Sequence, residues 1–599
     1  MDHLARSRSS HETVASAIFG ASRLGINLPA FVGADVSAIS YDTALTATGA
    51  IVRALTELGI TATDRVAFLA PRGPLGIIGF LGISSVATCC PFNPKLRAEE
   101  LEAAIKAMQV TALVLAGSNP VAEEIAIEAG MPSLLLRAGA HQLADMAIEP
   151  RPGRISATKR ASGPPEIAMM MQTSGTTSNP KLVALTHTNI LAAAGAIRDA
   201  FSLSEVDICL NPMPLHHVHG LVSAGISSLL SGSRIVCTDN FSTPAFAGIF
   251  DRLRPTWFTG SPAMHMALLD HFHAARSVPS RGSLRFFRSS SAPLPASAIE
   301  DLEKLFDAPL IETYGLTETA SMICSNRLPP GIRKSGSVGI AFGAEIRICD
   351  TAGAAQPAGQ NGEIVVRGPS VITRYGTDNG IPDSFFDGWL RTGDVGYLDD
   401  DGYLFIVGRT KELIKRGGLS VYPAEIDNIL TSHPDVVEAV AFSVPHPTLG
   451  EELVAAVVAR AGATPTESQL RSHLAEQLSP YKVPTVILVI DAIPKNDTGK
   501  ILRRELPKQL AVHLEPKRQP PVNAQEIMLL DLWKTVLSRD DFGVTDNVFL
   551  LGADPLRAGR VAELLNAGKQ LGVSARQLMA HPVVRDQVAL MSSKPAGSV

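Results

Sequence analysis

The sequence predicts a multidomain α/β protein, in which a large layered region of strands and helices is followed by smaller modules. Three observations lead to this prediction. The chain has 599 residues, too many for a single hydrophobic core, so three or four domains are expected. In its first part, apolar strand-like runs alternate with amphipathic helical runs, which is typical of mostly parallel sheets covered by helices. Residues 505–522 carry four prolines and several charges, as linkers do, and a helical pattern follows them.

The elements of the first part follow from apolar periodicity. Helices are expected at 41–60, 99–108 and 188–201, and strands at 65–70, 111–116, 167–171 and 182–185. Residues 73–94 are uncharged, but four glycines interrupt them and Pro91 and Pro94 end them. We therefore expect a buried helix and strand there rather than a membrane span. The stretch 150–165 is rich in Pro, Gly, Ser and Arg, which indicates a surface connection.

Composition narrows the class of protein. Apolar residues make up 45% and charged residues 19%, as in water-soluble globular proteins. The net charge of −5 gives no reason to expect nucleic acid or a membrane surface as partner. Six scattered cysteines without a C-x-x-C pair predict reduced thiols and a cytoplasmic location. No apolar run follows the charged N-terminus, so a secretory signal is not expected.

A polar loop lies between the two strands expected at 167–171 and 182–185. Hydroxyls and backbone N–H groups can surround a phosphate, and Lys181 can supply a positive charge. The loop is not a Walker motif, because Pro180 precedes the lysine and a strand-like run follows it. A solvated hairpin turn has the same composition, so the loop alone leaves both alternatives open. Its candidate phosphate-binding residues are Thr173, Ser174, Gly175, Thr176, Thr177 and Lys181.

Three histidines, His216, His217 and His219, lie within one proline-flanked run. They could be zinc ligands, but no carboxylate or cysteine set lies nearby in the sequence, so a pocket wall is the preferred interpretation. Further on, a strand at 284–288 ends in the small residues 289–293, which allow a flat ligand to lie against the backbone.

Carboxylates and cations recur at later turns. Glu318 lies among hydroxyls, where it is either a charge at a helix N-terminus or a ligand. Asp394 follows Gly393 in an expected tight turn, where it could accept hydrogen bonds from a ribose diol. The run 408–418 is basic and bounded by glycines, and Lys500 lies on a loop before two arginines.

Taken in order, six motifs between about residues 35 and 510 resemble those of the AMP-forming adenylating superfamily, which includes acyl-CoA synthetases, luciferase and peptide-synthetase adenylation domains. The runs 172–181 and 214–221 are most similar to the oxalyl-CoA-synthetase-like branch. The resemblance implies a large N-terminal adenylate-forming domain at 1–407 and a small mobile α+β domain at 408–515.

In that superfamily a carboxylate attacks the α-phosphate of ATP to give acyl-AMP and pyrophosphate, and a thiol then displaces AMP. Positioning and charge neutralisation supply most of the catalysis. The resemblance implies ATP and Mg²⁺ as cofactors, with CoA as the co-substrate.

The resemblance also implies roles for residues of this chain. Residues 173–181 would hold the β- and γ-phosphates, and Lys500 would bridge the acyl carboxylate and the α-phosphate. Thr317 would lie near the α-phosphate, Glu318 would associate with Mg²⁺, and Lys411 would be the hinge. The adenosine site would comprise Ser291, Ala292, Pro293, Thr313, Tyr314, Gly315, Asp394 and Arg409. The acid pocket would include His217, Val218, Gly260 and Thr319, and the thiol tunnel Gly417 and Gly418.

Two departures from the superfamily pattern bear on this reading. Ser178 and Leu182 stand where glycines are usual, and we expect phosphate binding to survive this. His217 stands where amino-acid adenylation domains carry an aspartate for the α-amino group. The expected substrate is therefore a carboxylic acid without an α-ammonium group.

After a linker at 516–522, residues 523–592 resemble an acyl or peptidyl carrier domain, a small four-helix bundle. Such domains attach phosphopantetheine to a serine that follows an aspartate. Here Pro555 follows Asp554 and offers no nucleophile, so no phosphopantetheine is expected on this chain. The fold can persist, because Asp554 can cap the helix and proline is tolerated at its first position. A generic helical bundle is the alternative.

The sequence thus predicts an ATP-dependent ligase that makes acyl-AMP from a small carboxylic acid and transfers the acyl group to a thiol, most simply that of CoA. One alternative is an acyl-AMP ligase that loads the pantetheine of a separate carrier protein in an assembly line. Another is an inactive scaffold that docks partners through the carrier-like domain. A P-loop nucleotidase is disfavoured by the missing Walker motif. Neither the acid nor the oligomeric state can be predicted from the sequence.

Overall fold

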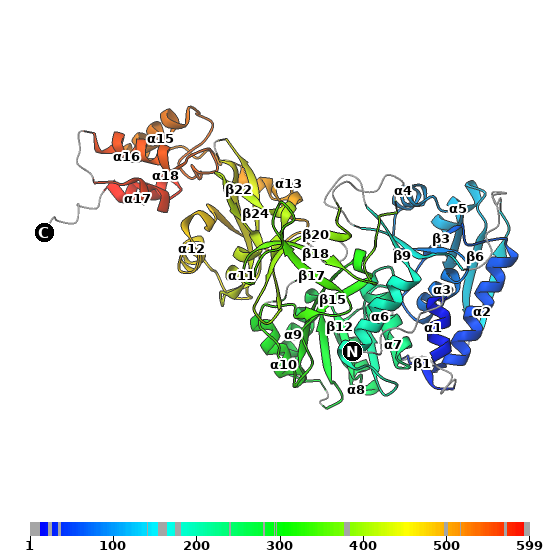
Figure 1. Cartoon of the computed structure of the whole chain (residues 1–599). Coiled ribbons are helices and arrows are strands. Elements are labelled where there is room, and N and C mark those ends of the chain that lie inside the picture. The colour runs from blue at the N-terminus through cyan, green and yellow to red at the C-terminus, as the bar shows by residue number, and fades with distance from the viewer. Residues whose placement is uncertain are drawn as a thin grey trace. The chain divides into compact units, whose positions relative to one another are not determined.

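A computed structural model gives the fold of the chain in two compact units, Met1–Ile406 and Val407–Val599 (Figure 1). The residues that it describes are 12–21, 27–33, 38–139, 142–153, 164–173, 181–238, 241–279, 282–292, 294, 296–376, 384–447, 449–495, 501–515, 517–567 and 572–591.

The first unit begins with a seven-stranded sheet in the order β7-β6-β5-β3-β4-β8-β9. Its strands are β3 (Arg65–Leu69), β4 (Thr88–Phe92), β5 (Ala112–Ala116), β6 (Ser133–Gly139), β7 (Gln142–Arg151), β8 (Ile167–Gln172) and β9 (Leu182–Thr186). The central strands are parallel, and β8 and β9 form an antiparallel hairpin. Helices cover both faces: α1 (Val14–Ala21), α2 (Tyr41–Glu57) and α3 (Pro74–Ser84) on one, α4 (Ala98–Met108) and α5 (Pro120–Glu128) on the other.

A nine-stranded sheet follows in the order β16-β15-β14-β13-β12-β10-β11-β1-β2. Its strands are β1 (Pro29–Phe31), β2 (Ile39–Ser40), β10 (Ile208–Asn211), β11 (Arg234–Cys237), β12 (Trp257–Gly260), β13 (Phe286–Ser289), β14 (Leu310–Leu316), β15 (Ser321–Ser325) and β16 (Ile340–Ala341). The run from β1 through β14 is parallel, so the carboxyl ends of these strands lie at one edge, where ligands bind in such sheets.

Helices also cover both faces of this second sheet. One face carries α8 (Thr243–Leu253), α9 (Pro262–Ala275) and α10 (Ala296–Phe306). The other carries α6 (His187–Phe201), the π-helix η2 (His219–Ile226) and α7 (Ser227–Leu230). Stacked aromatic pairs fix the register of β12 and β13: the ring centroids of Trp257 and Phe286 lie 5.5 Å apart, and those of Phe258 and Phe287 5.2 Å. The side chains at the ends of these strands are therefore held firmly.

A third, antiparallel sheet has the strands β17 (Glu345–Cys349), β18 (Gly362–Arg367), β19 (Phe385–Phe386), β20 (Trp389–Leu398) and β21 (Leu404–Arg409), and the boundary between the two units falls within β21. A short 3₁₀ turn, η3 (Thr317–Thr319), joins β14 to β15.

The second unit contains a mixed sheet in the order β23-β22-β25-β24, with β26 beside β25. The strands are β22 (Ile414–Arg416), β23 (Leu419–Val421), β24 (Val436–His446), β25 (Gly450–Ala459) and β26 (Val486–Val489). Helices α11 (Pro423–Ser432) and α12 (Glu467–Ala475) pack on one face, and α13 (Leu506–Gln509), with α14 (Ala511–Leu514) after it, packs on the other. Short 3₁₀ turns are η4 (Thr410–Glu412), η5 (Pro480–Lys482) and η6 (Arg503–Glu505).

The carrier-like bundle, residues 524–591, ends the second unit with α15 (Ala524–Leu537), α16 (Pro555–Asn566), α17 (Ala575–Ala580), α18 (Val584–Gln587) and the 3₁₀ turn η7 (Val588–Met591). Asp554 caps α16, because its side chain accepts a hydrogen bond from the backbone N–H of Arg557 at 2.8 Å, and Pro555 is the first helical residue. Both structural predictions for this pair are confirmed. The bundle also contacts the preceding sheet: His446 Nε2 lies 2.9 Å from the carbonyl oxygen of Phe549, and Asn547 donates to the carbonyl of Thr485 at 2.9 Å.

The structure corrects two sequence expectations and confirms others. The predicted helices and strands of the first part are present within a few residues, including the buried pair α3 and β4. Asp394, however, lies inside the long strand β20 and not in a tight turn; Gly393 before it has φ +74°, a left-handed conformation that glycine adopts readily. The first half of the expected linker at 505–522 is folded, because Leu506 and Leu510 are buried in the core beside β24 and β25. Among the described residues, no helix is both long enough and apolar enough to cross a membrane.

Candidate active site

The phosphate-loop motif connects the two strands of the β8–β9 hairpin. Gln172 pairs with Leu182, and the N–H of Thr173 donates to the carbonyl of Lys181 at 3.0 Å, so the hairpin brings the two ends of the loop together. The intervening Ser174, Gly175, Thr176 and Thr177, with Ser178 and Pro180, lie outside the residues that the structure describes.

Lys181, Tyr375 and Glu318 form a connected polar group. The Lys181 ammonium donates to the Tyr375 hydroxyl at 3.3 Å and lies 4.6 Å from the centre of its ring. The same hydroxyl donates to Glu318 Oε1 at 3.0 Å. Burial and the Glu318 carboxylate raise the pKa of Tyr375, so its proton stays in place near neutral pH. One hydroxyl therefore orients both the loop lysine and the candidate Mg²⁺ ligand.

Tyr375 was not among the residues predicted from the sequence. It is 4% exposed and pairs as an isolated bridge with Val183 of β9, which explains how it reaches the loop. In the sequence, Tyr375 lies in a short run after β18, directly before Gly376. This run has no pattern of hydroxyls or charges that would indicate a phosphate site, so the sequence alone does not identify Tyr375.

Tyr314 and Asp394, predicted to bind adenine and ribose, are in direct contact. The Tyr314 hydroxyl donates to Asp394 Oδ2 at 2.6 Å, and both side chains are buried. The backbone N–H of Asp394 donates to Thr392 Oγ1 at 3.0 Å. A tyrosine and a carboxylate held in this way present an aromatic face and hydrogen-bond acceptors together, as a nucleoside requires.

The turn that follows Tyr314 is too tight for a side chain at Gly315. A Cβ atom there would lie 1.8 Å from the carbonyl oxygen of Ser321, so glycine is required. In η3, Thr319 is fully buried and its hydroxyl donates to that same carbonyl at 2.6 Å, while Thr317 and Glu318 are half-buried. This arrangement leaves Thr317 and Glu318 accessible and uses Thr319 to hold the turn.

The predicted adenine-contacting segment is strained at one residue. Ser291 has φ +81°, which is uncommon for a residue with a side chain and is seen often at functional sites. Its hydroxyl lies 3.2 Å from His219 Nδ1. Ala292 is exposed, and Pro293 lies outside the described residues. Thr313 faces the interior: its hydroxyl donates to the carbonyl of Ser289 at 3.3 Å and accepts from Arg288.

In the histidine run, which was predicted to form a pocket wall, His216 and His217 are half-buried and His219 is buried. The rings of His216 and His217 lie 4.4 Å apart, and burial lowers the pKa of both. His217 Nε2 is buried and makes no hydrogen bond with any residue that the structure describes. Val218 is half-buried beside it, and a Cβ atom on Gly260 would contact the His265 ring at 3.4 Å. Within the described ranges, no cluster of three or more His, Cys, Asp or Glu residues could hold a metal ion.

Arg288, one residue before the end of β13, is a second residue that the sequence reading did not single out. It is 1% exposed and contacts Thr259 and Thr313 from the flanking strands. In the sequence it ends an ordinary strand pattern, so only the folded structure distinguishes it.

The remaining predicted residues belong to the second unit. Arg409 ends β21, and Lys411 lies in η4, exposed, with its carbonyl accepting from Arg504 at 2.5 Å. Gly417 and Gly418, at φ +59° and +86°, form the exposed turn between β22 and β23. Lys500 lies outside the described residues.

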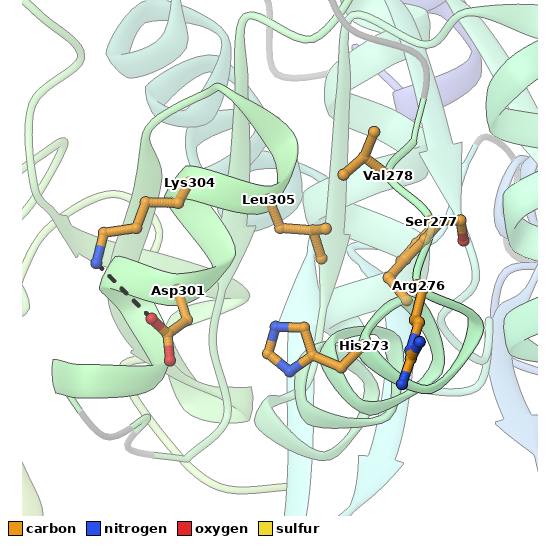
Figure 2. Close-up of a pocket in the computed structure, with 8 residues that line it drawn as sticks. His273, Arg276, Ser277, Val278, Asp301, Lys304 and Leu305 are labelled. Carbon is orange, nitrogen blue, oxygen red and sulfur yellow. Dashed lines mark ion pairs between the residues drawn. The ribbon is translucent and has the colours of Figure 1, made fainter.

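A surface pocket between α9 and α10 contains none of the predicted residues. His273, Arg276, Asp301 and Lys304 contribute to its lining, and Asp301 and Lys304 form an ion pair at 3.8 Å (Figure 2). It lies at the C-terminal ends of these helices. Because α9 begins where β12 ends, this pocket is at the opposite edge of the sheet from the candidate site.

Comparison with known families matches three segments of the chain. Residues 21–376 match the family described as AMP-binding enzyme, residues 425–500 its C-terminal domain, and residues 529–591 the family described as phosphopantetheine attachment site. The predicted superfamily and the carrier-like domain are thereby confirmed. The last match is in tension with the expected absence of the prosthetic group, which rests on Pro555 at the serine position.

Similar proteins are also found one by one. The oxalate–CoA ligase of Arabidopsis thaliana is 37% identical over 461 residues, which cover 76% of this chain and 89% of that protein. The sulfoacetate–CoA ligase of Cupriavidus necator is 41% identical over 341 residues, covering 57% and 66%. The crystal structure of ATP-bound MatB from Rhodopseudomonas palustris aligns with a TM-score of 0.73 at 27% identity, over 84% of this chain and 99% of MatB. The predicted fold class is confirmed.

Proposed function

We infer the catalytic roles below from the fact that this chain belongs to the AMP-binding enzyme family. It is an AMP-forming ligase of the acyl-CoA synthetase type, which activates a carboxylic acid with ATP and transfers the acyl group to the thiol of CoA. An oxygen of the carboxylate bonds to the α-phosphorus while the bond from that phosphorus to pyrophosphate breaks. The thiolate then bonds to the acyl carbon, and AMP leaves.

The observation that carries the proposed ATP site is the contact of Tyr314 with Asp394, two motif residues 80 positions apart in the sequence. We propose that the Tyr314 ring lies against adenine and that Asp394 accepts hydrogen bonds from the ribose hydroxyls. On binding, a ribose hydroxyl would take the place of the tyrosine proton at Asp394, or would share the carboxylate with it. Arg409, Ser291, Ala292, Pro293, Thr313 and Gly315 complete the proposed adenosine site.

We propose that residues 173–181 hold the β- and γ-phosphates, with the Lys181 charge stabilising the departing pyrophosphate. Tyr375 keeps Lys181 and Glu318 at fixed positions, so the cation and the carboxylate need not reorganise during the reaction. Mg²⁺, bound through the hard oxygen of Glu318, would neutralise phosphate charge. We propose that Thr317, next to Glu318 and half-buried, contacts the α-phosphate.

The second unit is proposed to act in both half-reactions. In the first, Lys500 would contact the acyl carboxylate and the α-phosphate and offset the charge that accumulates as two anions meet. A rotation at Lys411 would then withdraw it and present the turn at Gly417 and Gly418 to the thiol. The family match covers Lys500 at its last residue, which supports this assignment.

The proposed acid is small and polar. The two curated relatives described above are named for oxalate and sulfoacetate, both short acids with a second acidic group. His217, Val218, Gly260 and Thr319 are proposed as pocket walls. His217 takes the place of the aspartate that binds an α-ammonium group in amino-acid adenylation domains, and its uncharged imidazole does not favour such a substrate.

An acid-panel assay of pyrophosphate release tests the first half-reaction, and mass spectrometry of the products with CoA tests the second. We expect acyl-CoA with at least one short acid. Pyrophosphate release without acyl-CoA would instead support transfer to the pantetheine of a separate carrier protein. The fused carrier-like bundle favours that second candidate, because such domains occur beside adenylating enzymes in assembly lines.

We propose that the carrier-like bundle of this chain carries no phosphopantetheine, because Pro555 has no hydroxyl. We also propose domain boundaries at 1–407, 408–515 and 523–592, with 516–522 as the linker. Five cysteines are free and buried, namely Cys89, Cys90, Cys209, Cys324 and Cys349, which supports a reducing compartment such as the cytoplasm.

A further inference from the structure

Arg288 is a charged side chain enclosed by neutral groups. The residue is 1% exposed, and its guanidinium donates from Nε to Thr313 Oγ1 at 2.9 Å and from Nη1 to Thr259 Oγ1 at 3.4 Å. Nη2 makes no hydrogen bond to any described residue, and no described carboxylate forms an ion pair with Arg288. Burial lowers its pKa to about 9, so it remains charged near neutral pH.

A buried, unpaired guanidinium is unfavourable unless something compensates its charge. Moving a cation out of water costs far more than two hydroxyl acceptors recover, and buried charges in proteins are normally paired. Thr259 and Thr313 offer only oxygen lone pairs. A role confined to linking β12 and β14 would be served equally by a neutral donor, so the charge itself calls for a partner.

The position of Arg288 indicates where that partner would come from. Phe287 faces the core under α8–α10, and Arg288, the next residue along β13, faces the opposite side, covered by η2. There Thr259 also lies 2.6 Å from His219 Nε2, and His219 Nδ1 lies 3.2 Å from Ser291. The guanidinium thus shares Thr259 with His219, whose ring also contacts Ser291, near the carboxyl ends of the parallel strands.

The histidines around Arg288 do not supply the missing negative charge. Burial, and for His219 also the nearby guanidinium, lowers the pKa of His217, His219 and His265, so these rings are neutral. A neutral imidazole can donate one hydrogen bond. His217 Nε2, buried without a partner among the described residues, is an additional polar atom on this wall.

We propose that Arg288 binds a second anionic group of the substrate acid, so that the enzyme selects short dianionic acids over monoanionic acids of the same length. The inference rests on the proposed activation of an acid at this site and adds the residue that sets its charge preference. The carboxylate that reacts faces the α-phosphate, and the second carboxylate or sulfonate pairs with the guanidinium.

The test compares matched acids in a pyrophosphate-release assay: malonate with propanoate, succinate with butanoate, and oxalate with glyoxylate. The wild type should prefer a dianion by at least about tenfold in kcat/KM. Arg288→Met, which keeps the length of the side chain without its charge, should lose about 100-fold with that dianion. Its activity with the matched monoanion should stay within about threefold of the wild type. Arg252→Met, the same change on an exposed face of α8, should alter neither.

Two results would overturn the inference while leaving the proposed function intact: equal use of both acids by the wild type, or an equal loss of both in Arg288→Met, which would indicate a structural role. Arg288→Lys guards against misfolding, since it keeps the charge but not the planar fork; it should still prefer the dianion, with kcat/KM for that acid reduced only about threefold.

Calorimetry measures the affinity of the wild type and of Arg288→Met for malonate without turnover, when a non-hydrolysable ATP analogue is present. Binding at least about tenfold weaker in the variant supports the subsite, and equal binding overturns it. If no acid releases pyrophosphate while malonate still binds through Arg288, the proposed function fails and the subsite stands.

Discussion

The candidate active site and the carrier-like bundle differ in which features of their matched families they contain. In the first unit, segments distant in sequence bring charged and hydroxyl groups into contact: Lys181 with Tyr375 and Glu318, and Tyr314 with Asp394. In the bundle, Pro555 stands at the position where carrier domains have the modified serine, although the family that the bundle matches is described as a phosphopantetheine attachment site. We therefore propose that the first region keeps the groups that its reaction needs and that the bundle keeps only the carrier fold.

The stabilising contacts of the bundle explain why its fold tolerates a proline at position 555. Trp533 is fully buried and donates to Gln587 Oε1 at 2.7 Å, and Asp546 accepts from the backbone N–H groups of Lys517 and Gly543. None of these stabilising contacts involves the side chain at position 555. Proline suits the first turn of a helix, where a backbone N–H would have no partner. The fold of the bundle therefore does not depend on the side chain at this position.

The largest expected effect comes from the residue proposed to act in the acid-activation step. Lys500→Ala should lower the rate of adenylate formation about 10²–10³-fold, because a cation that stabilises transition-state charge is lost. Pyrophosphate release under single-turnover conditions measures it. Lys495→Ala removes the same charge five residues earlier, where the side chain forms an ion pair with Glu438 at 2.6 Å, and should change the rate little. An unchanged rate in Lys500→Ala would contradict the mechanism.

Removal of one hydroxyl should have a smaller effect. Tyr375→Phe keeps the ring beneath Lys181 but loses both hydrogen bonds that position Lys181 and Glu318. We expect kcat/KM for ATP to fall about tenfold, as for hydrogen bonds to charged groups. Steady-state kinetics at varied ATP and Mg²⁺ concentrations measure the change.

Tyr403 provides a matched control for that variant. Its ring also lies under a lysine, with Lys334 Nζ 4.6 Å from the ring centre, and its hydroxyl donates to the carbonyl of Ile332 at 2.8 Å. Tyr403→Phe therefore loses a comparable hydroxyl away from the candidate site and should keep wild-type kinetics. Equal losses in the two variants would show that the effect of Tyr375 is on folding.

Sequence patterns predicted the helices and strands that depend on neighbouring residues. They did not predict features that depend on contacts between segments distant in sequence. Apolar periodicity located α2, β3 and the β8–β9 hairpin, because each depends on its own residues. It misplaced Asp394, since a glycine before an aspartate looks the same in a turn and in an irregular strand. The π-helical form of η2 has no distinct sequence signal, because its apolar run suits an ordinary helix as well.

Tyr375 and Arg288 could not be predicted for the same reason. Tyr375 acquires its role through Val183, which is nearly two hundred residues earlier, and Arg288 through strands on either side of β13. Arg288 follows two phenylalanines and reads as an ordinary strand end. The burial of Arg288, on which the proposed role depends, arises only when the sheet is folded.

Acid should destabilise the first unit more than the bundle. Burial lowers the pKa of His187 to about 4, of His216 to about 3 and of His265 to about 4. The native state therefore excludes protons that the unfolded chain binds below about pH 6.5, so the stabilisation is complete above that pH and is lost as the pH falls towards 4. The bundle, residues 524–591, has a single histidine, His581, and it is exposed.

One carboxyl opposes this trend. Burial and Glu303 raise the pKa of Glu312 to about 7, so its contribution is present at low pH and is lost as the pH rises towards 7. Three histidines outweigh one carboxyl between pH 6.5 and 5. Differential scanning calorimetry should show the Tm of the first unit falling by about 3–6 °C across that interval. His216→Gln should reduce the fall; a Tm that is constant or that rises would contradict this account.

The smallest energetic effect is expected at residue 555 of the bundle. Pro555→Ser should cost at most about 1 kcal/mol of bundle stability, because Asp554 still caps α16 and only the rigidity of proline is lost. Acid activation should be unchanged. After treatment with a pantetheinyl transferase and CoA, intact-mass analysis should show no added group on the wild type and one phosphopantetheine on Pro555→Ser. A gain of that mass by the wild type would mean that another hydroxyl serves as acceptor, whereas no gain by the variant would mean that the bundle has lost recognition as well as its nucleophile. A gain by the variant alone would show that one side chain separates a domain that keeps the carrier fold from one that can carry an acyl group.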